Sequence, residues 1–142
     1  MKKPALVLSV LLLAGCTSDD AVSLKNFARS GVFPPTLSSY DSAMEYVRYL
    51  QVRGRVDRVR IGMSSFIVVF QHGSGIPVVK IAVYRRTLWS WKFVAEPRPK
   101  ISPDASLVSE FLRATVSDGK IMVVGERSNR SWLLYDPNEN SG

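Results

Sequence analysis

The sequence predicts an α+β domain in which an antiparallel sheet of about five strands carries two helices packed on one face. Residues 38–53 repeat their apolar positions every three or four residues, whereas the segments from residue 55 onward alternate with a period of two. Short turn-like links join the alternating segments, which favours hairpins and therefore antiparallel pairing. The expected order of elements is α-β-β-β(β)-α-β-β.

The first helix is expected from Ser38 and Ser39, which are both good N-cap residues, towards Arg53. Gly54 can terminate it. Its apolar face consists of Ala43, Met44, Val47 and Leu50.

Three strands are expected next. Residues 55–63 alternate between apolar and basic side chains, and residues 66–70 form an apolar run rich in β-branched residues. The turn-forming residues His72-Gly73-Ser74-Gly75 precede a further strand over residues 77–86, which predicts a hairpin. Residues 89–96 continue as a strand that ends before Pro97.

A second helix is expected after Ser102, because Pro103 suits the first helical position and Asp104 complements the helix dipole. Its apolar stripe consists of Leu107, Val108, Phe111, Leu112 and Thr115. Two final strands, over residues 120–126 and 132–135, flank the turn 127–130.

Length and composition bound the possible chemistry. With 142 residues the chain is long enough for one domain, and 22% charged residues is too few for a disordered chain. One cysteine excludes an intramolecular disulfide and any multi-cysteine metal site, and one histidine excludes His-rich metal triads. We therefore expect no cofactor.

The amino terminus has the organisation of a signal peptide. Lys2 and Lys3 precede ten apolar residues, 5–14, which rise only about 15 Å as a helix and cannot span a bilayer. The segment ends in Leu13-Ala14-Gly15-Cys16, which resembles the lipobox of bacterial lipoproteins. The resemblance covers only these first residues. The alternative is a secretory signal in which Cys16 is incidental.

The resemblance implies cleavage before Cys16, a diacylglycerol on its thiol and acylation of the new amino group. Each buried methylene of such an anchor contributes about 0.8 kcal/mol, so two or three acyl chains hold a protein on the membrane. Thr17 resembles the residue of outer-membrane-sorted lipoproteins in a Gram-negative host. The implied organisation is a signal peptide (1–15), a lipidated tether (16–37) and one periplasmic α+β domain (38–142). Phe27, Val32 and Phe33 of the tether are able to dock onto the domain.

The positive charge is concentrated in the middle of the chain. The net charge of +7 falls to +5 without residues 1–15, and residues 48–100 hold eleven Lys or Arg against two acidic residues. Strand alternation predicts that Ile81, Val83 and Trp91 face the helices, leaving a basic face on the other side of the sheet. The expected partner-binding residues on that face are Arg58, Arg60, Lys80, Tyr84, Arg86 and Lys92. The alternative is a solvated face with no partner.

No catalytic motif stands out. His72 lacks a neighbouring nucleophile and orienting acid in the sequence, and Cys16 cannot act as a nucleophile once it is lipidated. Asp57 and Glu96 lie in the basic section, where positive charge favours the ionised carboxylate over a general acid. Trp89 has the parity of a core residue; were it exposed, it would suit a hot spot for a partner protein.

We therefore expect a non-enzymatic lipoprotein, anchored in the outer membrane on its periplasmic side, that binds an acidic envelope protein. It would act as an accessory or assembly factor, for example of a secretion, pilus or conjugation system. The compartment makes nucleic acid an improbable partner despite the charge. The alternative is a periplasmic ligand-binding or inhibitory module that captures a glycan or lipid between sheet and helices.

Overall fold

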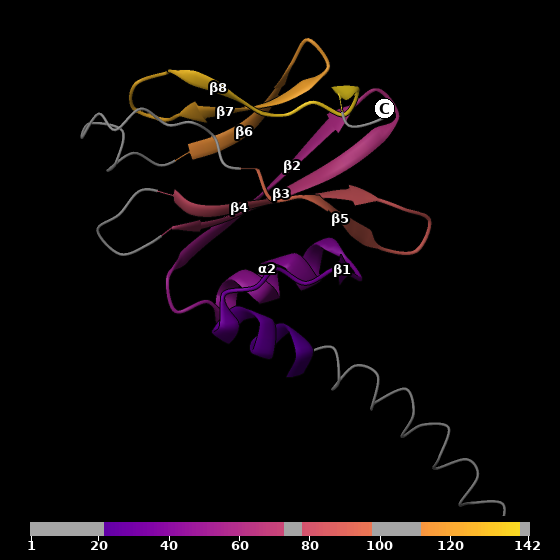
Figure 1. The fold of residues 1–142 in the computed structure, drawn as a ribbon, viewed down its shortest axis with the longest axis vertical. Coiled ribbons are helices and arrows are strands. Elements are labelled where there is room, and N and C mark those ends of the chain that lie inside the picture. The colour runs from indigo at the N-terminus through magenta and orange to yellow at the C-terminus, as the bar shows by residue number, and fades with distance from the viewer. Residues whose placement is uncertain (1–21, 73–77, 98–111, 140–142) are drawn as a thin grey trace, which may run out of the picture.

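The computed structural model describes residues 22–72, 78–97 and 112–139 and confirms the α+β class (Figure 1). A helix over residues 22–30 precedes α2 and eight strands, and all strand pairs are antiparallel. The elements are β1 (Thr36–Leu37), α2 (Tyr40–Tyr49), β2 (Arg53–Ile61), β3 (Ser64–His72), β4 (Val78–Arg86), β5 (Trp91–Ala95), β6 (Leu112–Ser117), β7 (Lys120–Gly125) and β8 (Ser131–Tyr135).

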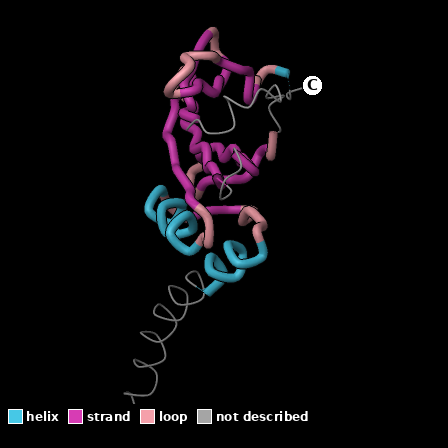
Figure 2. The backbone as a smooth tube through the Cα atoms, turned by 90° about the vertical axis from the view of Figure 1, so that its left-hand side faces the viewer, coloured by secondary structure: helices cyan, strands magenta, loops and turns pink. Residues whose placement is uncertain are grey.

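The strands form two sheets that stack into layers with the helices. The larger sheet has the order β1-β5-β4-β3-β2, and the smaller one has the order β6-β7-β8. Helix 22–30 and α2 lie on one face of the five-stranded sheet, and the three-stranded sheet covers the other (Figures 1 and 2). An antiparallel sheet with two helices on one face was predicted, but its members differ: helix 22–30 takes the place of the helix expected after Ser102, and β7 and β8, expected in the same sheet, belong to a second one.

The predicted first helix begins where its capping residues indicate and ends earlier than expected. Ser39 caps α2 by accepting a hydrogen bond from the Ser42 N–H over 3.1 Å, and Leu50 is already extended. Gly54 therefore does not end the helix but lies in β2. A Cβ there would sit 2.5 Å from Val47 Cγ1, so the glycine permits close packing of α2 on the sheet.

The segment expected as a tether is partly ordered and belongs to the core. Leu24 and Ala28 of helix 22–30 are buried, as are Phe33 and Leu37 of the following segment, residues 31–37, which we call the strap. They pack with α2 and with the helix-facing side of the sheet. The buried residues of this helix-side core are Leu24, Ala28, Phe33, Leu37, Ala43, Tyr46, Val56, Ile67, Val69, Ala82, Tyr84 and Trp91.

Polar groups of α2 and the sheet hold the strap in place. Tyr46 Oη donates to Val32 O over 2.9 Å, and Tyr84 Oη donates to Pro34 O over 2.6 Å. Lys80 Nζ donates to Gly31 O over 2.8 Å. These bonds satisfy carbonyl groups of the strap that would otherwise lose water as it docks.

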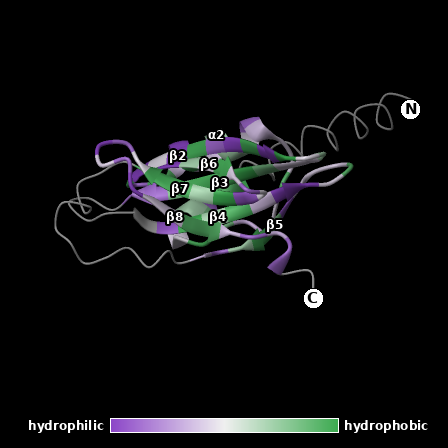
Figure 3. Ribbon diagram, turned by 90° about the horizontal axis from the view of Figure 1, so that it is seen from above, coloured by the Kyte–Doolittle hydropathy of each residue, from purple (hydrophilic) through white to green (hydrophobic). Residues whose placement is uncertain are grey.

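A second core lies between the two sheets. Phe66, Val68 and Phe70 of β3 face Ile121 and Val123 of the smaller sheet within one buried cluster. Because β3 is buried on both faces, its sequence is a continuous apolar run instead of an alternating one. The hydrophobic colouring along the middle of β3, β4 and β7 in Figure 3 follows this double burial.

Two local predictions were wrong. The helix expected after Ser102 was to include Leu112 and Thr115, but these residues belong to strand β6, in which Ala114 pairs with Val123 of β7. Residues 102–111 lie outside the described residues. His72 is not an exposed turn residue. It is the last residue of β3, is 8% exposed, and stacks on Phe70 with ring centroids 6.1 Å apart.

Candidate functional site

The predicted basic face is not one open face of the structure. Tyr84 is fully buried under the strap, and Lys80 is half-buried with its ammonium group on Gly31 O. Both residues face the helices, since Tyr84 pairs with Ile67 and Lys80 pairs with Gln71 across the sheet. The structure therefore removes these two residues from any exposed contact surface.

The other four predicted residues are exposed but dispersed. Arg58 lies with its guanidinium 4.4 Å from the Tyr40 ring centroid, and Arg60 Nε donates to Gly62 O over 3.1 Å. Arg86 stands over the Trp91 ring at the end of β4, with 5.5 Å between its Cζ and the ring centroid. Lys92 pairs with Arg85 and so lies on the opposite face from Arg86. Cys16 lies outside the described residues.

The face assignment was inverted because the prediction allowed for only one sheet. Ile81 and Val83 face the three-stranded sheet, not the helices. Trp91 does face the helices, because the turn over residues 87–90 pairs it with Arg86, which lies on the same side of β4 as Tyr84. Alternation counted straight through residues 87–90 does not describe this hairpin, because it treats the turn as part of a strand.

Two hairpin turns lie together at one end of the five-stranded sheet. The β2–β3 turn and the β4–β5 turn are neighbours because Phe66, near the start of β3, pairs with Arg85, near the end of β4. Arg85 Nη2 also donates to Ser64 Oγ over 3.0 Å. Both turns are on the right of Figure 1.

These turns carry the most exposed large apolar side chains of the described residues. Met63 in the β2–β3 turn is 94% exposed, and Leu88 and Trp89 in the β4–β5 turn are 88% and 89% exposed. The turn itself is well ordered by hydrogen bonds: the Thr87 N–H donates to Ser90 O over 2.7 Å, and the Ser90 N–H donates to Thr87 Oγ1 over 3.1 Å. This closure directs Leu88 and Trp89 outward.

Basic side chains surround the apolar tips. Residues 58–66 and 84–93 contain five Lys or Arg and no acidic residue. We define the hairpin-end surface by its exposed members, Met63, Arg85, Arg86, Leu88, Trp89 and Lys92. Sequence reasoning missed it because residues 89–96 were assigned to one strand; the pair Thr87 and Ser90 was the available signal for a turn.

A groove joins the β4–β5 turn to the start of the described chain. It has a volume of about 270 Å³ and is bordered by helix 22–30, the strap and the turn. Ser23 and Leu24 line it on the helix, Pro35 and Leu37 on the strap, and Ser90 on the turn. The beginning of helix 22–30 and the β4–β5 turn therefore border the same groove.

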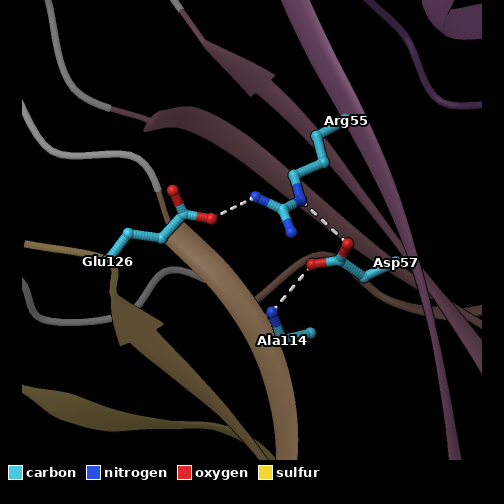
Figure 4. A network of polar contacts seen from close by, with 4 residues as sticks. All are labelled: Arg55, Asp57, Ala114 and Glu126. Carbon is cyan, nitrogen blue, oxygen red and sulfur yellow. Dashed lines mark hydrogen bonds and ion pairs between the residues drawn. The ribbon is translucent and has the colours of Figure 1, made fainter. Parts of the chain in front are cut away.

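One charged cluster joins the two sheets (Figure 4). Asp57 accepts hydrogen bonds from Arg55 Nε and from the Ala114 N–H, both over 2.8 Å, and Arg55 Nη1 donates to Glu126 over 2.7 Å. Burial lowers the pKa of Arg55, but its bonds to Glu126 and Asp57 outweigh this and raise the pKa overall. Because Asp57 and Glu126 both bind groups of the protein itself, the cluster acts as a structural connection between the sheets.

Within the described ranges, no three His, Cys, Asp or Glu side chains come together as a metal site. No helix in the part of the chain that the structure describes is both long and apolar enough to cross a membrane. No protein-family model, curated protein or solved structure matches the chain.

Proposed function

We propose that the protein is a bacterial lipoprotein, anchored through Cys16 on the periplasmic side of the outer membrane, that binds an acidic envelope protein without catalysing a reaction. In this role it serves as an accessory or assembly factor of an envelope machine. The position of the only cysteine supports the anchor, because Cys16 directly follows the apolar segment 5–14.

The observation that carries the binding role is the basic edge, which we define as Arg58 and Arg60 on β2. β2 is the outermost strand of its sheet and pairs only with β3 in that sheet. Arg58 is stacked on Tyr40, and Arg60 is bonded to Gly62 O, so both guanidinium groups are oriented before a partner arrives. Neither forms an ion pair within the described residues, which leaves both available to carboxylates.

The anchor is tested by the fate of Cys16. The Cys16→Ser variant should not incorporate labelled fatty acid and should leave the membrane fraction, whereas the wild-type protein should remain there until detergent is added. Incorporation of label by the Cys16→Ser variant, or an unlabelled wild-type protein, would contradict the anchor.

The binding role is tested by charge reversal on the basic edge. Arg58→Glu with Arg60→Glu should remove an acidic protein that co-purifies with the wild-type chain from its own envelope. The matched control reverses two exposed charges of the smaller sheet's turns, Lys120→Glu with Arg127→Glu, and should retain that protein. Both pairs should unfold at the wild-type temperature. Equal recovery with all three proteins would overturn the proposal.

The alternative of a ligand held between sheet and helices has no supporting observation. Buried side chains such as Tyr46, Ile67 and Tyr84 fill that space in the described residues. The groove beside the strap lies at the margin of this core.

A further inference from the structure

The hairpin-end surface exposes large apolar side chains next to basic ones. Leu88 and Trp89 are adjacent in the chain and almost fully exposed, and Met63 extends from the neighbouring turn. Leaving such side chains in water forgoes about 1.5–3 kcal/mol for each one that could be buried. A surface of this kind is therefore expected to have a counterpart.

The chemistry of the surface fits the interface of an anionic membrane. Tryptophan favours the headgroup level of a bilayer, where its ring is partly apolar and its N–H meets polar groups. Arg86 and Lys92 are exposed beside the tips and lie on opposite faces of the sheet, so they flank the tips on both sides. Each basic residue near an anionic leaflet contributes about 1 kcal/mol of attraction.

The location of the surface brings it to the membrane that the proposed anchor would occupy. Only five residues separate Cys16 from Val22, and six fully extended Cα–Cα steps span about 20 Å. Ser23, one residue further, lines the same groove as Ser90 of the β4–β5 turn.

We propose that the hairpin-end surface rests in the headgroup region of the anionic membrane that holds the lipid at Cys16, with Met63, Leu88 and Trp89 inserted at the interface. This inference relies on the proposed lipid anchor. It gives the domain a fixed orientation, because a lipid at one point and an inserted surface at another prevent free rotation. Arg58 of the basic edge lies four residues back from Gly62 along β2, about 13 Å from the turn, and stays clear of the bilayer. Arg60, which is bonded to Gly62 O, lies beside the turn at the level of the headgroups.

A protein partner for the same tips is less well supported. Binding hot spots on protein surfaces concentrate at well-packed, desolvated centres of an interface. Here the apolar side chains extend from two separate convex turns with about nine tenths of their area exposed. The short spacing from Cys16 also restricts what else can reach them once the chain is anchored.

The experiment measures the environment of Trp89 in the full mature chain on vesicles of phosphatidylethanolamine and phosphatidylglycerol. Brominated lipid quenches tryptophan in the bilayer interface, and iodide quenches tryptophan in water. The Trp89 contribution is the difference between the wild-type protein and Trp89→Phe, and Trp132→Phe serves as the matched control. We expect brominated lipid, and not iodide, to quench the Trp89 component, while Trp132→Phe keeps the wild-type response.

Charge and anchoring are varied separately. Arg86→Glu with Lys92→Glu, or vesicles of phosphatidylcholine alone, should make Trp89 accessible to iodide while the protein stays anchored. Coupling Cys16 to a maleimide lipid anchors the chain even if cells do not acylate it, so failure of the proposed lipidation is distinguished from failure of membrane insertion. A Trp89 component that is quenched by iodide but not by brominated lipid, with either anchor, would overturn the inference. In that case a photo-crosslinker at residue 88 that captures an envelope protein would assign the surface to a protein partner.

Discussion

Asp57 is expected to be the main polar connection between the two sheets. Its carboxylate is only 15% exposed and accepts from both Arg55 Nε and the Ala114 N–H. In the Asp57→Ala variant the Ala114 N–H loses a charged acceptor, which costs about 1.5–3 kcal/mol, and the partly exposed Arg55 pair adds up to about 1 kcal/mol. We therefore expect a loss of about 3 kcal/mol in the free energy of unfolding, or about 10 °C in Tm.

Urea unfolding of the full chain, followed by tryptophan fluorescence, measures this loss. Glu126→Gln is the matched variant, because Glu126 is 44% exposed and binds only the other end of Arg55; its cost should stay below about 1 kcal/mol and vanish in high salt. Asp57→Asn retains one acceptor oxygen and should fall between the two. Amide exchange in β6 should accelerate in Asp57→Ala more than exchange in β3. If Asp57→Ala stays within about 0.5 kcal/mol of the wild type, the reasoning about the connection is refuted.

Three further outcomes follow from burial and hydrogen bonding. Trp91 is 2% exposed and Trp89 is 89% exposed, so Trp91→Ala should cost about 3–5 kcal/mol in thermal unfolding and Trp89→Ala less than about 0.5 kcal/mol. Similar losses would contradict the turn that separates the exposed Trp89 from the buried Trp91. Tyr84→Phe leaves Pro34 O without its donor and should cost about 1–3 kcal/mol in urea, together with faster proteolysis in the strap; an unchanged midpoint would contradict the role of this bond. Burial first, and then two nearby arginine charges, lower the pKa of His72 below its ordinary 6.5. Below pH 6.5 the unfolded chain then binds a proton at His72 that the folded chain does not, so the free energy of unfolding should fall by at most about 1.4 kcal/mol per pH unit as the pH is lowered. His72→Gln should remove this dependence, and an identical pH profile in the variant would contradict it.

Local signals in the sequence predicted the elements whose own residues determine them. The serine cap of α2 and the alternating pattern of β2 lead directly to the observed elements. The α+β class and the antiparallel pairing of β2, β3 and β4 followed from such signals.

The missing parts depend on contacts distant in sequence. Helix 22–30 has only one apolar set at helical spacing, Leu24, Phe27 and Ala28, and their burial depends on α2 and the sheet, which follow later in the chain. Leu112 to Ser117 fits a helical stripe and a strand about equally until Ala114 pairs with Val123.

The candidate site was foreseen only in its charge. The surplus of arginine in the middle of the chain was visible in the sequence, and Arg58 and Arg60 are exposed as expected. Which residues share a face was not predictable, because the second sheet and the turn between Arg86 and Trp91 determine it.

The docking of the strap has a mechanical consequence. A load applied at residue 22 reaches the sheet through helix 22–30, then through carbonyl groups held by Tyr46 and Tyr84, and finally along β1, which pairs edge to edge with β5. Strands pulled along their length resist by shearing several bonds together. A load on residue 22 is therefore transmitted to the sheet by the docked strap, and residues 31–37 do not act as a slack linker while these bonds hold.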